Sequence, residues 1–151
     1  MVARFPLPSI ASLQDPATIP IKDEEAREQA RLVAALRRCW VDLPDHLHPC
    51  IFHVPNGGSR NKVEGYNLKI QGVLAGVMDL VIVAPQGLTV FIEMKAHDGR
   101  EGTSQIELRK WFKALDHHVI IAYSAEEALR SLSALFNTNG ELSENIQAGT
   151  R

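Results

Sequence analysis

Cysteine is scarce in this sequence, with only Cys39 and Cys50 among 151 residues. The two are not spaced like the paired cysteines of a structural zinc site, and no three of the six histidines have zinc spacing. Small secreted scaffolds that rely on disulfides are far richer in cysteine. We therefore expect two reduced cysteines in the core of a cytoplasmic protein.

Long apolar runs and a strong net charge are also missing. No stretch approaches the length of about 20 residues that crosses a bilayer. Pro6, Pro8 and Pro16 interrupt any signal-like segment, so we expect no secretory signal. A net charge of -2 disfavours a non-specific nucleic-acid coat protein, but it allows an enzyme with a local basic groove. A hydrophobic content of 45% is enough to form one core.

Two apolar segments, residues 76–83 and 88–95, predict the centre of the fold. Both are rich in β-branched residues, and residues 84–87 between them have turn chemistry. They read as the two strands of a hairpin. Because the apolar runs are nearly continuous, we expect both strands to be buried on two faces.

Charged residues interrupt these two strands. Asp79 lies in the first, and Glu93 and Lys95 lie on one face of the second. A buried charge is very costly without a partner, and a divalent cation shared by Asp79 and Glu93 would supply one. The backbone carbonyl of Met94 could add a ligand. Oxygen ligands suit Mg²⁺ or Mn²⁺, which can acidify a bound water, while Lys95 could position that water or stabilise a phosphate.

The rest of the chain predicts an α/β domain around this hairpin. Its order is helix, three strands, helix, strand, helix, which favours a mixed four-stranded sheet with helices on both faces. We expect three segments: an N-terminal arm (1–22), a domain (23–136) and a polar tail (137–151). Besides the hairpin, the domain should contain a first helix (23–40), strands at 50–54 and 118–122, and two helices that open in capping boxes at Ser104 and Ser124.

Other polar residues are candidates for the same site. Glu25 falls within the apolar stripe of the first helix, with Glu28 on its flank, so Glu25 is expected to point toward the sheet. The helix dipole alone also favours a Glu in this first turn. Gln105, at a helix start, could orient water or a phosphate oxygen. Residues 59–72 read as a phosphate-contacting loop carrying Arg60, Lys62 and Lys69, or as a solvated surface loop.

Asp79 followed by Glu93-Met94-Lys95 resembles the PD-(D/E)XK nuclease superfamily, and more narrowly the VRR-NUC family. The family pattern has a helical Glu with Gln four residues on, a segment like residues 53–58, a Gly-x-Pro-Asp-Leu motif, Glu-x-Lys, and a Gln opening a helix. In this chain the matching positions are Glu25 and Gln29, residues 53–58, residues 76–80, Glu93 to Lys95, and Gln105. The likeness covers roughly residues 23–135. Met78 stands where the family has proline, so we expect an altered local backbone rather than lost activity.

The resemblance implies a restriction-endonuclease-like αβββαβ core. It also implies an enzyme that uses Mg²⁺ or Mn²⁺ to hydrolyse DNA phosphodiester bonds, working as a homodimer on branched DNA such as four-way (Holliday) junctions. A bacterial cell or a phage-infected host is the implied setting. Two other readings stay open. One is a DNA-binding or assembly module that keeps the fold without cutting. The other is a salt bridge of Lys95 that only braces the sheet.

Overall fold

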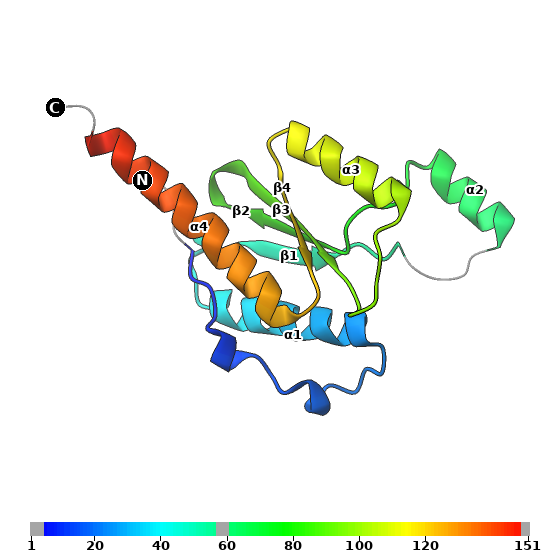
Figure 1. Ribbon diagram of the computed structural model, residues 1–151, viewed down its shortest axis with the longest axis horizontal. Helices are drawn as coiled ribbons and strands as arrows, with labels where there is room; N and C mark the ends of the chain where they lie inside the picture. The colour runs from blue at the N-terminus through cyan, green and yellow to red at the C-terminus, as the bar shows by residue number, and fades with distance from the viewer. Residues whose placement is uncertain (1–4, 57–60, 149–151) are drawn as a thin grey trace.

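The computed structural model describes residues 5–56 and 61–148, which form a four-stranded sheet with helices on both faces (Figure 1). The strand order is β1-β2-β3-β4. The first three strands pair antiparallel, and β3 pairs parallel with β4. The predicted mixed sheet is confirmed. The strands are β1 (Cys50–His53), β2 (Leu80–Ala84), β3 (Leu88–Met94) and β4 (His118–Ala122).

The helices divide between the two faces of the sheet. Helices α1 (Glu24–Trp40) and α4 (Ala125–Ala148) share a core with one face, and α3 (Thr103–Ala114) covers the other. On the first face, the core contains residues such as Leu32, Trp40, Ile92 and Leu132, all fully buried. On the second face, the ring of Phe91 stacks on that of Phe112 of α3, with centroids 4.3 Å apart.

The central hairpin forms, but the prediction of a first strand over residues 76–83 was wrong at its start, because β2 begins at Leu80 and Asp79 precedes it. The register still places the charged residues together. Leu80 pairs with Ile92 and Val81 with Phe91, so Asp79, just before β2, lies opposite Glu93 of β3. The expectation of burial on two faces holds for most of the hairpin. Val83 is the exception, because it lies near the turn end of β2 and is 47% exposed.

The segment predicted as a phosphate-contacting loop, residues 59–72, is helical over most of its length. Helix α2 (Lys62–Ile70) begins after Asn61, whose side chain accepts a hydrogen bond from the Glu64 N–H at 2.8 Å. Gly72 follows with φ of 95°, a backbone conformation that favours glycine. The loop prediction was wrong because this N-cap was not recognised. Arg60 lies outside the residues that the structure describes.

The proline-rich N-terminal arm packs along α1 of its own chain. Phe5 is buried against the rings of Trp40 and Phe136. The indole N–H of Trp40 donates to the carbonyl of Pro6 at 2.8 Å, and Arg31 Nε donates to the carbonyl of Gln14 at 2.7 Å. These contacts give the arm a fixed course although it has no periodic pattern.

Helix α4 begins as predicted and extends further than predicted. The Ser124 hydroxyl accepts from the Glu127 N–H at 3.1 Å, as in a capping box, but the Glu127 carboxylate reaches back to the N–H of Tyr123. The helix continues to Ala148, so the first part of the expected polar tail is helical.

The two cysteines are both free, and their burial differs from the expectation. Cys39 is partly buried and Cys50 is exposed at the start of β1, an edge strand. The prediction of two core cysteines was therefore wrong for Cys50. Across residues 5–56 and 61–148, no helix is long and apolar enough to cross a membrane.

Candidate active site

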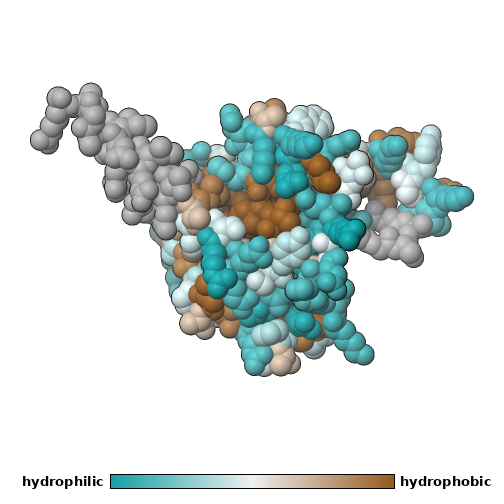
Figure 2. Space-filling view, viewed as in Figure 1, coloured by the Kyte–Doolittle hydropathy of each residue, from teal (hydrophilic) through white to brown (hydrophobic). Residues whose placement is uncertain are grey.

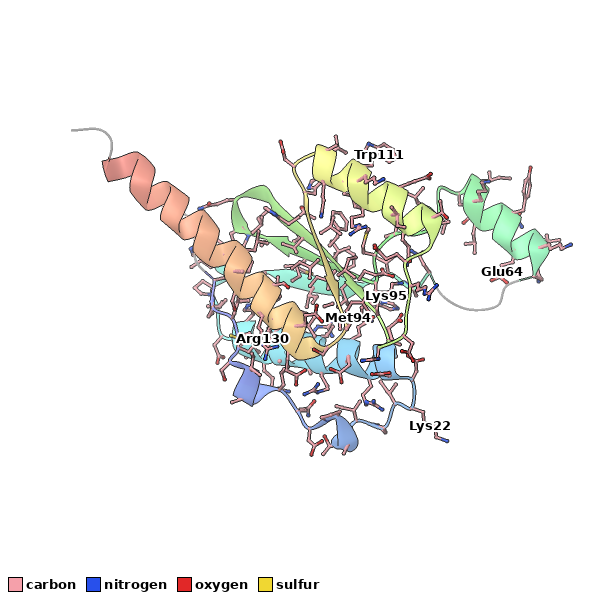
Figure 3. The ribbon with its side chains drawn as sticks, viewed as in Figure 1. Lys22, Glu64, Met94, Lys95, Trp111 and Arg130 are labelled. Atoms are coloured by element: carbon pink, nitrogen blue, oxygen red, sulfur yellow. The ribbon has the colours of Figure 1, made fainter. Side chains whose placement is uncertain are left out.

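Asp79, Glu93 and Lys95 form one hydrogen-bonded cluster at the end of the central hairpin. Lys95 lies where β3 leaves the sheet toward α3 (Figure 3). Its ammonium group is 2.7 Å from Glu93 Oε1, and the two residues are only 7% and 2% exposed. The backbone N–H of Asp79 donates to Glu93 Oε2 at 3.3 Å, and the Met94 N–H donates to Asp79 Oδ2 at 3.1 Å. The structure thus brings the three predicted residues together.

Gln105 joins this cluster from the first turn of α3. Its side-chain amide donates to Glu93 Oε1, and its carbonyl oxygen accepts from Lys95 at 3.1 Å and from the Gly102 N–H at 2.9 Å. The predicted capping box, with Ser104 as N-cap and Glu107 reaching back, was wrong. Gly102 is the N-cap, and Gln105 fills the place expected of Glu107, which is exposed.

Gly76 sets the distance between the Asp79 segment and α3. Its φ is 83°, and a Cβ atom there would lie 2.8 Å from the Ser104 carbonyl carbon and 2.9 Å from the Gln105 nitrogen. Real Cβ contacts are essentially never so short. Only glycine allows the start of α3 to approach this closely. The sequence marked Gly76 as part of a motif but did not show what it contacts.

The structure separates the two candidate carboxylates of α1. Glu25 Oε2 accepts from the N–H of Ala96, next to Lys95, at 3.3 Å. Glu28 faces another part of the molecule, where its carboxylate accepts hydrogen bonds from the Arg31 guanidinium at 2.6 Å and from the Ala125 N–H at 3.0 Å. Glu25 is therefore the helix carboxylate that reaches the cluster, as its place in the apolar stripe predicted.

Burial raises the pKa of both carboxylates in the cluster. Desolvation is the main cause for Asp79 and for Glu93, and each is raised further by another negative charge, that of Glu25 on Asp79 and that of Asp79 on Glu93. Burial acts to lower the pKa of Lys95, but its hydrogen bond to Glu93 and the surrounding carboxylates outweigh this effect and raise it. The site gathers more negative charge than Lys95 neutralises.

The donor set fits a hard divalent cation. Asp79 and Glu93 present carboxylate oxygens side by side. The Met94 N–H donates to Asp79 Oδ2. Because the N–H and C=O of one strand residue point to the same edge of the strand, the Met94 carbonyl also lies on the edge of β3 nearer Asp79. No group of three or more His, Cys, Asp or Glu side chains suited to a metal occurs among the residues described. Mg²⁺ does not need one, because it is commonly held by one or two carboxylates with water completing the shell.

His53, the last residue of β1, and Asn56, in the turn that follows, hold the Asp79 segment in place. His53 Nδ1 lies 2.8 Å from the Asp79 carbonyl oxygen, which also accepts from the Val54 N–H. The Asn56 amide donates to the carbonyl of Val77 at 3.3 Å. The sequence matched both residues to the family segment 53–58, but it gave neither of them a partner. The position of Asn56 in a Pro-Asn-Gly-Gly turn was the available signal.

Two of the three predicted DNA contacts, Lys62 and Lys69, do not join the cluster. Lys62 and Lys69 are exposed on α2, which projects from the body of the molecule (Figure 1). Helix α2 lies on the same side of the molecule as the start of α3 (Figure 1).

Comparisons with known proteins show similarity in fold. No family model matches the chain, and no curated protein matches it. A solved structure described as "VRR_NUC domain protein" superposes with a TM-score of 0.56 and 17% identity, covering 76% of this chain and 88% of the other. A second, described as "VRR_NUC domain", gives a TM-score of 0.46 and 16% identity over 71% of this chain and 95% of the other. The first supports the nuclease-domain fold that the sequence resemblance implied.

Proposed function

We propose that this protein is a VRR-NUC-type endonuclease that hydrolyses DNA phosphodiester bonds with Mg²⁺ or Mn²⁺, acting on branched DNA such as four-way junctions. One observation carries the proposal. On a fold shared with a VRR_NUC domain protein, Asp79, Glu93, Lys95 and Gln105 form a single hydrogen-bonded cluster. The junction preference rests on the sequence resemblance.

Asp79, Glu93 and the Met94 carbonyl would hold the cation directly, and Glu25, which accepts from the neighbouring Ala96 N–H, would bind it through a water molecule. When bound, such a cation neutralises charge on a phosphoryl oxygen and lowers the pKa of a bound water. Lys95 keeps its proton because carboxylates surround it, so it can donate to a phosphate oxygen or hold the attacking water. Gln105 fixes the direction of the Lys95 ammonium group through a bond of 3.1 Å. The Gly102 N–H in turn fixes Gln105.

The alternatives explain the cluster less well. A brace for the sheet does not require these charges, because buried ion pairs add little net stability over apolar residues. A non-catalytic module would have no use for two carboxylates whose charged forms burial disfavours. Charge that weakens a fold is expected where a site needs it for function.

A gel assay on labelled DNA tests the proposal. Four-way junction, splayed-arm and linear duplex DNA are each incubated with Mg²⁺, Mn²⁺ or EDTA. We expect paired symmetric cuts in the junction that require metal. Metal-dependent cutting of all three substrates would support a nuclease and contradict the junction preference. Binding without cutting in either metal would contradict the enzyme and favour the non-catalytic module.

We further propose that the protein acts as a homodimer. Two sites related by a two-fold axis would suit the two equivalent strands of a symmetric junction. Light scattering measures the mass in solution directly. A mass near 33 kDa, about twice that of the 16.7 kDa chain, supports this, and a monomer at the concentrations used for cleavage contradicts it.

A further inference from the structure

Helix α2 carries an exposed apolar stripe. Val63, Tyr66 and Ile70 follow the spacing i, i+3, i+7, which places them on one face of the helix, and all three are about two-thirds exposed. No residue of α2 is buried. Val73 and Leu74 continue the exposed apolar surface beyond the end of the helix. Such a surface is typical of a binding site.

Positive charge lies along one edge of this stripe. At about 100° per residue, Lys62 and Lys69 fall on the same side of the stripe, and Glu64 falls on the opposite side. Figure 2 shows hydrophilic and hydrophobic side chains together on this projecting helix, at the right of the view. The surface therefore combines an aromatic and aliphatic face with a lysine edge.

A second copy of the chain is a poor occupant of this stripe. In an antiparallel two-fold pair of helices, each edge meets the same edge of the partner. Lysines would then face lysines, and Glu64 would face Glu64 of the partner subunit. A parallel pair would set the two lysines of each copy against Asn67 and the single Glu64 of the other, which leaves an excess of positive charge. A partner that brings both apolar rings and negative charge fits better.

The segment that follows α2 leads toward the candidate active site. The chain runs from the end of α2 to Gly76, which packs on the backbone of Ser104 and Gln105. A groove of about 650 Å³ lies between this connecting segment and a different face of α2 from the stripe, and its lining includes Asn56, Leu68, Lys69 and Leu74. Asn56 also holds the segment that leads to Asp79. A ligand on α2 and a phosphodiester at the cluster could belong to one DNA molecule.

We propose that α2 binds unstacked bases at the branch point of the DNA substrate. Tyr66 stacks on an exposed base, and Val63 and Ile70 contact the neighbouring base or sugar. Lys62 and Lys69 bind the adjacent phosphates. Stacking on an aromatic ring tolerates any base, because every base has a π-face, so this contact would select DNA structure rather than sequence. The inference rests on the proposed function in taking DNA as the substrate.

Binding measured in EDTA tests this proposal without any cleavage. Wild type, Tyr66→Ala, Tyr66→Phe and the control Trp111→Ala are titrated against a four-way junction and a duplex by fluorescence anisotropy. Tyr66 and Trp111 are 65% and 59% exposed, and Trp111 lies on α3, far from the Glu64 of α2 (Figure 3). We expect Tyr66→Ala to bind the junction roughly 5- to 100-fold more weakly. Tyr66→Phe and Trp111→Ala should bind it as wild type does.

A stacking probe and the lysines give independent readouts. A junction with 2-aminopurine at the branch should change its fluorescence on binding wild type, and this change should be lost with Tyr66→Ala. Lys62→Gln and Lys69→Gln should weaken all DNAs alike and each reduce the slope of log affinity against log salt by about 1.

Several outcomes would overturn the proposal. Junction binding by Tyr66→Ala equal to that of wild type would do so, as would an equal loss on duplex DNA. Conversion of a dimer to a monomer by Tyr66→Ala would show that α2 is an interface between copies instead. Tyr66-dependent junction binding by a protein that never cuts would support this inference and contradict the nuclease activity. Failure to bind any DNA would contradict both.

Discussion

Replacing Gly76 by alanine should damage both the stability and the active site. Gly76 has φ of 83°, and its new Cβ would lie 2.8 Å and 2.9 Å from backbone atoms of Ser104 and Gln105. The left-handed conformation costs a non-glycine residue roughly 1–2 kcal/mol. Pushing backbone atoms apart adds about 1–3 kcal/mol, as overpacking does in a core. We expect the free energy of unfolding to fall by about 2–5 kcal/mol.

Urea unfolding measures this loss, and Gly87→Ala is the matched control. Gly87 also has positive φ, 75°, but a Cβ there meets no atom within 4 Å. The control should lose only the conformational part, about 1–2 kcal/mol. Because α3 must shift to admit the new methyl group, Gln105 should move relative to Glu93 and Lys95. Cleavage by folded Gly76→Ala should therefore be slower than cleavage by Gly87→Ala.

Equal losses of stability in the two variants would refute this reasoning. The contact between Gly76 and the start of α3 would then contribute nothing. Full cleavage by Gly76→Ala would show that the position of Gln105 does not depend on this contact.

Three further predictions concern single side chains. Excess Mn²⁺, at 100 times its dissociation constant, should stabilise wild type against urea by about 2.7 kcal/mol and leave Asp79→Asn unchanged. The Arg31 hydrogen bond lowers the pKa of Glu126 below its ordinary value of 4.5. The ion pair therefore stabilises the fold fully at a pH above 4.5, and this stabilisation is lost as the pH falls through the lowered pKa. The difference in unfolding free energy between wild type and Glu126→Gln should therefore shrink from pH 7 to pH 3. Glu25→Gln should slow cleavage and raise the Mn²⁺ concentration for half-maximal rate; an unchanged metal dependence would remove Glu25 from the site.

The central sheet could be predicted because its signals are local. Apolar runs on both sides of a turn defined β2 and β3, and their register followed from the short connection. Helix α2 was missed because its apolar stripe faces solvent and its N-cap, Asn61, stands among other polar residues. A pattern that predicts burial says little about a helix that buries nothing.

The candidate site was predicted where residue spacing determines geometry. Glu93 and Lys95 share a strand face, and Asp79 follows from the hairpin register. Helical periodicity favoured Glu25 over Glu28 without deciding between them, and the structure places Glu25 beside Ala96 and Glu28 beside Ala125. Contacts between distant segments could not be predicted from the sequence. The approach of Gly76 to α3 and the hydrogen bond from the Gly102 N–H to Gln105 depend on how α3 packs.

The rate of junction cleavage by wild type and by Asp79→Asn in Mg²⁺ tests the central claim most directly. Asparagine keeps the size of the side chain and can still accept from the Met94 N–H, so the fold should persist, which circular dichroism verifies. We expect a loss of at least about 100-fold, the usual effect of removing one catalytic electrostatic group. Cleavage at an equal rate would show that the cluster of Asp79, Glu93 and Lys95 is not the site of phosphodiester hydrolysis.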